Sequence, residues 1–317
     1  MKTFYQIYNN DFPAMTEVST TANKSFAKTL INDTQRIVLA YAPWKFLEYT
    51  DTVTTVDGTN NYQLPAHMRK VVNVKITVGT VIYRPRPVED PDFWEYLQGL
   101  GTDESDVAQR FYQYDGKVYL WPTPATTGST VTIRGRKRWR DLSLDNYTTG
   151  NVTAATNADE TITGSGTTWA TGSTENHIRI DYTYGDFKWY EISSITDATH
   201  LELIKKYEGT TFTGQTETYT IGEMSIIPSE YHDLLLWRPL AIYYMQNAQE
   251  QTRSDRFFML YDGGYERGLS PRVGGLMKLM MDQELEQTEG VFIEPSESVV
   301  DDIKKFRISD DITGESW

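Results

Sequence analysis

Residues 189–204 read WYEISSITDATHLELI and contain the alternation that decides the fold. Within this stretch, residues 189–195 and 200–204 alternate apolar with polar side chains, which is the pattern of half-buried strands. Residues 177–182 alternate in the same way, and glycine-rich turns separate these runs. Several short strands at this spacing predict a small all-β barrel or sandwich over residues 150–222.

Helix-forming sequence flanks this β block on both sides. One of the hydroxyl residues at 19–21 is suited to cap a helix that runs to about Tyr41. We expect the buried stripe of that helix to contain Phe26, Leu30, Ile37, Val38 and Tyr41. Residues 1–18 are expected to be extended and irregular. A second helical stretch begins near Pro228 and continues, broken by glycines, to about residue 286.

The segment before the β block also contains strands. The runs 111–114 and 117–121 flank Asp115-Gly116, a dipeptide that favours a two-residue hairpin turn. Further strands are expected over residues 71–76 and 130–139. The helical framework therefore includes a β-hairpin region.

Together these patterns predict an α+β fold with a discontinuous core. Residues 1–149 and 223–286 form the helical core with its β-hairpin region, and residues 150–222 are inserted into it as a second domain. Residues 287–317 are expected to form an extended acidic C-terminal tail. From Asp282 to the end, 11 Asp and Glu face 3 Lys and Arg, a composition typical of a segment without a fold of its own.

Composition excludes several kinds of site. The chain has no cysteine, which excludes disulfides, thiolate metal ligands and cysteine nucleophiles. No apolar signal core follows Met1, and no run approaches about 18 apolar residues, so we expect a soluble protein made in the cytosol with no membrane partner. The net charge of −14 argues against wrapping DNA over a broad face, because phosphate binding needs clustered Lys and Arg. It does not argue against lining a channel, whose acidic wall would repel the DNA backbone.

Three spaced phrases carry a resemblance to a known family. They read YQLPA at 62–66, YLWPTP at 119–124 and IPSEYHDLL at 227–235. In this order they resemble the head-to-tail adaptor (connector or head-completion) proteins of tailed bacteriophages, over roughly residues 19–149 and 223–286. The inserted block resembles a β module of various phage structural proteins, through its phrases at 162–169, 185–201 and 207–209.

The resemblance implies a structural role in the virion. Such adaptors form a ring, usually dodecameric, between the portal protein and the tail or nozzle protein, and DNA passes transiently through the lumen. The expected location is the neck of the virion, after synthesis in the host cytoplasm. The resemblance carries over no enzymatic residues and no cofactor. It leaves the partner of the insert open, with a fibre or capsid protein as further candidates.

The acidic C-terminal tail is the leading candidate site, because the resemblance implies that it reaches into the portal. Burying one apolar anchor contributes roughly 1.5–3 kcal/mol, whereas ordering each residue costs about 1–2 kcal/mol. The anchors alone do not offset that cost, so either part of the tail orders or it pairs with a partner strand. The alternative is a solvated tail. The expected portal-binding residues are Phe292, Ile293, Phe306, Ile308 and Trp317.

A basic run forms the second candidate site, at a subunit interface or in the channel. The four arginines share one face if the strand continues through them, because side chains alternate with period two. Three interpretations remain open: a DNA-contacting patch, a receptor for acidic tails of adjacent subunits, or a strand edge protected by charge. The four residues are Arg134, Arg136, Arg138 and Arg140.

Aromatic residues of the insert form the third candidate site. They are a possible ligand or partner face that binds a glycan or a fibre, or simply the core of the barrel. The residues are Trp169, Trp189, Tyr190 and Tyr207. The first interpretation gives the alternative function, a tail accessory or host-recognition protein.

The sequence offers few residues in arrangements suited to catalysis or metal binding. No two of the histidines at 67, 177, 200 and 232 have metal-ligand spacing on a helix, so no metal site is expected. Carboxylates of the insert would suit glycoside cleavage but are better explained as turn and surface residues. They are Asp181, Asp186, Glu191 and Asp197. We therefore expect no enzymatic activity.

Overall fold

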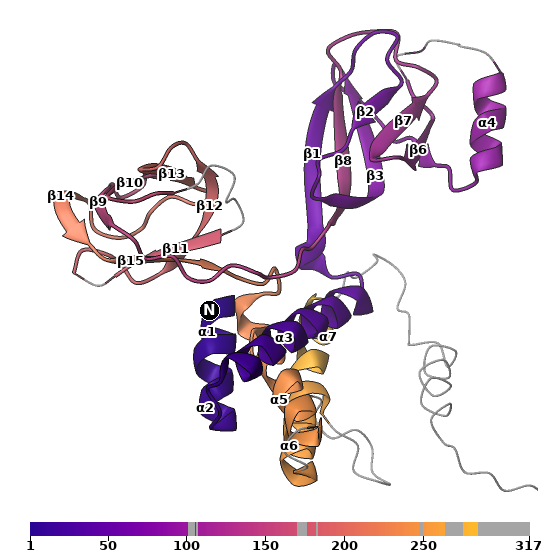
Figure 1. Cartoon of the computed structure of the whole chain (residues 1–317). Helices are drawn as coiled ribbons and strands as arrows, with labels where there is room; N and C mark the ends of the chain where they lie inside the picture. Colours follow the sequence, from indigo (N-terminus) through magenta and orange to yellow (C-terminus); the bar gives the residue numbers. More distant parts are fainter. Residues whose placement is uncertain are drawn as a thin grey trace, which may run out of the picture.

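The computed structural model describes residues 1–100, 105, 107–169, 176–181, 183–246, 250–263 and 275–284. Helix and strand are nearly equal, at 32% and 33%, so the fold class is α+β as expected. Figure 1 shows three lobes: a helical lobe, a curled-sheet lobe and a two-sheet lobe that carries α4.

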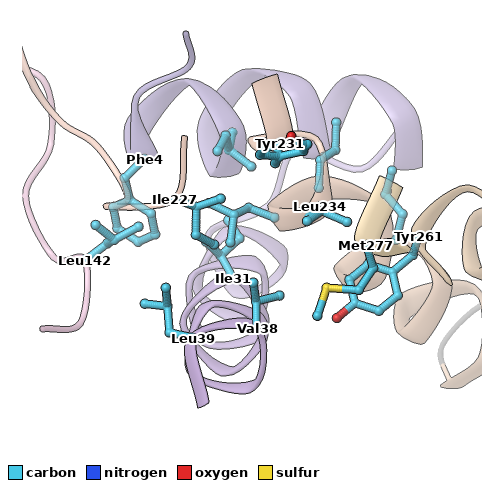
Figure 2. Close-up of a cluster of buried hydrophobic side chains, with 14 of the residues drawn as sticks. Phe4, Ile31, Val38, Leu39, Leu142, Ile227, Tyr231, Leu234, Tyr261 and Met277 are labelled. Carbon is cyan, nitrogen blue, oxygen red and sulfur yellow. The ribbon is translucent and has the colours of Figure 1, made fainter. Parts of the chain in front are cut away.

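The helical lobe combines both ends of the described chain. Its helices are α1 (Phe4–Gln6), α2 (Phe12–Thr16), α3 (Thr21–Tyr41), α5 (Leu234–Gln246), α6 (Gln251–Asp262) and α7 (Leu276–Glu284), with a π-helical turn over Ile7–Asp11. One apolar cluster joins them, and Figure 2 shows Phe4 and Ile31 from the first segment beside Ile227 and Leu234 from the second. The lobe is thus stabilised by contacts between distant parts of the sequence.

The first residues are helical, so the expectation of an extended and irregular segment was wrong. Thr3 caps α1: its hydroxyl accepts from the Gln6 amide, and the Gln6 side chain accepts from the Thr3 amide. The apolar side chains recur at helical spacing and are buried under the lobe. They are Phe4, Ile7, Tyr8 and Phe12.

Helix α3 begins after its cap Thr20 and ends at Tyr41, as predicted. Its expected stripe was partly wrong, because Ile37 and Tyr41 are exposed whereas Leu30 and Val38 are buried. Polar residues with satisfied hydrogen bonds complete the buried face instead: the Thr34 hydroxyl, for example, donates to the Leu30 carbonyl at 2.7 Å. The stripe predicted from hydrophobicity alone is therefore rotated about the helix axis relative to the face that is buried.

The two-sheet lobe is larger than a hairpin region. Its strands are β1 (Glu48–Thr54), β2 (Asn61–Gln63), β3 (Met68–Val78), β4 (Val81–Tyr83), β5 (Arg86–Pro87), β6 (Arg110–Tyr114), β7 (Lys117–Trp121) and β8 (Thr130–Lys137). They form sheets of order β1-β8-β3-β4 and β2-β7-β6-β5, which bury a common apolar cluster. The β6–β7 hairpin is confirmed: φ is positive at both Asp115 and Gly116, as a type I′ turn requires.

Helix α4 (Pro91–Gly99) covers the second of these sheets. Trp94 and Leu97 are buried and pack on aromatic rings of β6 and β7. Trp94 stacks on Tyr112, with ring centroids 5.3 Å apart. Phe93, beside Trp94 on the same helix, is exposed.

The curled-sheet lobe contains the inserted block. Its strands are β9 (Asn151–Ala155), β10 (Thr161–Ser165), β11 (Asn176–Ile180), β12 (Trp189–Ile195), β13 (His200–Leu203), β14 (Phe212–Glu217) and β15 (Tyr219–Glu223). They form one sheet of order β14-β9-β10-β13-β12-β11-β15 around a single apolar cluster. The two end strands of this sheet, β14 and β15, are separated in the sequence only by Thr218. The sheet is therefore strongly curled, because its two edges must lie near each other.

Candidate functional site: the junction of the three lobes

The connecting segment (residues 138–147) leads from the two-sheet lobe, past helix α3, to the curled sheet. The Asn32 side chain fixes its backbone twice: Nδ2 donates to the Leu142 carbonyl at 2.9 Å, and Oδ1 accepts from the Leu142 amide at 2.8 Å. Gln35 Nε2 donates to the Arg140 carbonyl at 2.8 Å. Arg36 forms an ion pair with Asp141. The first half of the connecting segment is therefore fixed along the side of α3.

Glu223, at the end of β15, fixes the same segment from the other side. Its side chain is 1% exposed. Oε2 accepts from the amides of Ser143 (2.5 Å) and Leu144 (2.7 Å). Oε1 lies 3.1 Å from Arg140 Nη2, which makes an ion pair although the two atoms are not aligned as a hydrogen bond. A buried carboxylate requires such compensation, because desolvation strongly disfavours an isolated charge.

The entrance and exit of the curled sheet lie beside each other. Tyr147 and Ile221 exchange both backbone hydrogen bonds, at 2.8 and 2.9 Å. The Tyr147 hydroxyl also accepts from the Thr168 amide at 2.9 Å. The chain thus enters and leaves this lobe through one pair of adjacent strands.

Two histidines lie at the junction and are shielded from water. Burial lowers the pKa of His177 to about 4, and burial also lowers the pKa of His232. His232 lies between backbone groups: its Nε2 is 2.9 Å from the Ile227 carbonyl, and its Nδ1 accepts from the Lys2 amide at 3.2 Å. Both rings are therefore neutral at pH 7.

A cavity of about 80 Å³ lies where the lobes meet. Helix α3 contributes Gln35, the curled sheet contributes His177 and Glu191, and the connecting segment contributes its basic first residues. The cationic side chains of the lining are Lys137, Arg138 and Arg140. The lining of this cavity is suited to pairing with charged groups, and its residues come from all three lobes. Among the described residues, no group of three or more His, Cys, Asp or Glu side chains could hold a metal ion.

Residues 9–164 match the family model described as SU10 adaptor protein. The resemblance to phage adaptor proteins is confirmed by this match. The family is a structural, phage head-tail adaptor family. No curated protein matches the chain. The matched residues run from the helical lobe through the two-sheet lobe and the connecting segment into β10.

The four arginines of the basic run do not share one strand face, so that prediction was wrong. Arg134 and Arg136 do lie on the same outer face of β8, and Arg134 pairs with Glu48 through Nη2 and Oε1 at 2.5 Å. Arg138 and Arg140 lie beyond the strand. β8 ends because its neighbours begin opposite its last residues: β1 starts opposite Arg136 and β3 opposite Lys137.

The aromatic residues of the insert are mostly in its core. Trp169, Tyr190 and Tyr207 are buried and have no exposed ring face to offer a ligand. Trp189 is half-buried, with the Arg179 guanidinium 4.9 Å from its ring centroid. Binding of a glycan or a fibre by these residues stays a prediction.

The carboxylates of the insert are engaged within the lobe. Asp186 accepts from the Tyr190 hydroxyl, and Asp181 accepts from the Thr218 hydroxyl at 2.8 Å. Asp197 accepts from the Thr199 amide and contacts His200, and these hydrogen bonds lower its pKa to about 2. This pattern is typical of turn residues rather than of a catalytic pair.

An exposed aromatic patch on the two-sheet lobe had escaped the sequence analysis. Phe93 and Tyr96 stack on the outer face of α4, with ring centroids 6.3 Å apart, and Tyr96 is 61% exposed. Tyr114 is 62% exposed at the end of β6. The spacing of Phe93 and Tyr96, three residues apart on one helix, was the available signal. Exposed aromatic clusters of this kind mark protein interfaces.

The predicted portal-binding residues Phe292, Ile293, Phe306, Ile308 and Trp317 lie outside the described residues. None of the helices in the described part of the chain has the length and apolar composition needed to cross a bilayer.

Proposed function

We propose that this chain is a virion structural protein that forms a ring, dodecameric in number, joining the portal to the tail at the neck of the virion. The match of residues 9–164 to the phage adaptor family carries this proposal. In it, residues 1–149 and 223–286 form the adaptor core, and residues 150–222 form a separate domain that meets the tail, a fibre or the capsid. The ring lines the channel for DNA.

The layout of the lobes supports a role in which one subunit contacts several partners. The three lobes lie apart except at the junction (Figure 1), so each can offer a surface to a different protein. Large apolar side chains are exposed on the helical lobe and suit contacts between neighbouring subunits. They are Ile37 and Tyr41 on α3, Met259 and Leu260 on α6, and Leu279 on α7.

Charge supports the passage of DNA without adhesion. The net charge of −14 favours a channel wall that repels phosphates over one that binds them. We propose that the acidic tail, residues 287–317, docks on the portal through Phe292, Ile293, Phe306, Ile308 and Trp317. Linking many tails in one ring would add avidity to individually weak contacts.

Electron microscopy of the purified chain, alone and with the portal protein, tests the proposal. The expected result is ring particles, with density added beneath the portal in the mixture. The matched variant lacks residues 288–317. It should retain the circular dichroism of the full chain and lose portal binding. A chain that stays monomeric, ignores the portal and instead binds glycans would contradict the proposal.

A further inference from the structure

The cavity at the junction combines positive charge with unpaired polar atoms. Lys137, Arg138 and Arg140 line it together with one carboxylate, Glu191, and a second carboxylate, Glu223, pairs with Arg140. Glu191 faces His177 across the β11–β12 pair, and the His177 ring is neutral because burial lowers its pKa to about 4. The lining therefore carries an excess of cations at neutral pH, which favours an anionic occupant.

The unpaired atoms narrow the chemistry of that occupant. Gln35 is 1% exposed, and its Oε1 is buried without a hydrogen-bond partner among the described residues. The same holds for Nδ1 of His177. Buried polar atoms nearly always have a partner. An occupant that displaces the atoms covering Gln35 Oε1 would supply a donor to it, and the cations of the lining call for acceptors.

A peptide with acidic side chains supplies both kinds of group. Its backbone N–H donates, and its carboxylates accept from guanidinium and ammonium groups. A phosphodiester backbone offers acceptors only. Arginine pairs through two hydrogen bonds with a carboxylate as it does with a phosphate, so the need for a donor is what favours the peptide. A cavity of about 80 Å³ accommodates a few atoms of such a peptide rather than a large ligand.

We propose that this cavity binds carboxylate-bearing residues of the chain's own C-terminal segment, residues 285–317. From Asp282 onward, 11 Asp and Glu face 3 Lys and Arg, so the charge is complementary. The segment starts at the end of α7, where Lys45 Nζ donates to the Gln283 carbonyl at 3.2 Å. At about 3.3 Å per residue it spans on the order of 100 Å when extended, enough to reach the cavity of its own or a neighbouring subunit.

Such binding would couple the segment to the arrangement of the lobes, because the cavity lining comes from all three. This inference deepens the proposed function: the segment that docks on the portal would also fasten subunits before or during assembly. The proposed ring and the proposed occupant of the cavity can be tested independently. Microscopy detects the ring, whereas chemical coupling identifies the occupant of the cavity.

The test uses the full chain and a carbodiimide, which joins amines to carboxylates that already form ion pairs. Among the described residues that line the cavity, Lys137 alone carries an amine. Mass spectrometry should find Lys137 joined to Asp or Glu within residues 285–317. Mixing unlabelled with nitrogen-15-labelled chains shows whether the two come from one subunit or from neighbours, and either result supports the proposal.

Arg138→Gln keeps the amine of Lys137 and removes a second cation from the lining. Loss of one charge-assisted contact should lower the coupling yield about tenfold. Arg110→Gln, in β6 and outside this cavity, is the matched control and should leave the yield unchanged. Coupling of Lys137 only to carboxylates outside residues 285–317 overturns the proposal. A second result also overturns it: duplex DNA abolishes coupling in the unsubstituted chain and binds less tightly to the Arg138→Gln variant. The cavity would then be a DNA-binding site.

Discussion

At the scale of single residues, Glu223 illustrates how one side chain joins parts of the fold. It is buried at the end of β15, and one of its oxygens accepts from two consecutive amides of the connecting segment. A carboxylate serves better here than a neutral side chain, because hydrogen bonds to a charged acceptor are about twice as strong. Its second oxygen lies near Arg140, which balances the charge.

Replacing Glu223 by Ala should destabilise the fold. The amides of Ser143 and Leu144 would lose their acceptor, at a cost of about 2–4 kcal/mol in the free energy of unfolding. Urea denaturation followed by tryptophan fluorescence measures this. Glu208→Gln is the matched control: Glu208 is exposed, so its pair with Lys188 is worth little. Equal stability of the two variants would rule out the assigned role of Glu223.

His177 should make stability depend on pH. Its pKa in the folded chain is about 4, against 6.5 for an unperturbed histidine. The unfolded chain therefore binds more protons between these values, and stability falls as pH falls. The loss from pH 7 to pH 5 is about 2 kcal/mol for this group. Urea denaturation of His177→Gln should show a smaller slope over that range and an unchanged slope from pH 7 to 8. His232, whose pKa is also lowered, accounts for part of the remaining slope.

Individual residues differ in how far the sequence predicts their place. Asp115-Gly116 was predictable because positive φ is a local requirement that few residues meet. Ile37 and Tyr41 were not, because the buried face of α3 contains Thr34 and Gln35, whose burial depends on hydrogen bonds. Gln35 bonds to a backbone carbonyl 105 residues away, which no local pattern reveals.

At the scale of elements, strand β8 shows how tightly the two-sheet lobe is packed. It lies between β1 and β3. A Cβ at Gly135 would come within 2.5 Å of the Lys70 carbonyl and 2.9 Å of Met68 Sδ. The pairing with β3 shifts register on both sides of this point, so the close approach coincides with irregular pairing.

Gly135→Ala should therefore weaken the lobe by about 1–3 kcal/mol, because overpacking in a central strand forces the backbone to move. Differential scanning calorimetry would record the lower transition temperature. Gly99→Ala, at the end of α4 with no atom within 4 Å of the new Cβ, is the control and should leave the transition unchanged or slightly higher. An unchanged transition temperature for Gly135→Ala would contradict the described packing.

Helix α3 offers a second test through neighbouring side chains. Val38 is fully buried and Ile37 is 44% exposed. Val38→Ala should lower the free energy of unfolding by about 2 kcal/mol through lost burial and the cavity left behind. Ile37→Ser should change it by less than about 0.5 kcal/mol. Chemical denaturation of both variants decides between the observed face and the one expected from hydrophobicity.

Elements with strong local periodicity were predictable, and short ones were not. The ends of α3 and β12 were close to expectation, because caps and alternation define them. The helices α1 and α2 were missed: each is so short that its stability comes from packing against the lobe. The second sheet was missed too, because β2 and β5 contain only a few residues each.

At the scale of the whole molecule, the junction determines how the lobes are held. Asn32 of α3 and the backbone of Leu142 are 110 residues apart in sequence and exchange two hydrogen bonds. Such contacts cannot be inferred from either segment alone. The candidate site at the junction was therefore predictable only in its basic residues, and not in Gln35 or Glu223.

Asn32→Ala should loosen the connecting segment while the lobes stay folded. Hydrogen exchange measured by mass spectrometry should rise in peptides covering residues 141–147 and stay unchanged in β1. The lost hydrogen bonds correspond to about 1–2 kcal/mol. Asp33→Ala, the next residue of α3, removes only an exposed contact with Arg36 and should not alter exchange in the connecting segment. If both variants exchange alike, Asn32 does not fix this segment.

The pairing of Tyr147 with Ile221 bears on how a protein of this architecture can diversify. An inserted domain whose two ends lie beside each other leaves no gap in the rest of the chain when it is removed or exchanged. A shorter turn, or an unrelated module with neighbouring termini, can replace it without displacing the surrounding polypeptide. The same position is a natural place to graft a fluorescent label for following particle assembly.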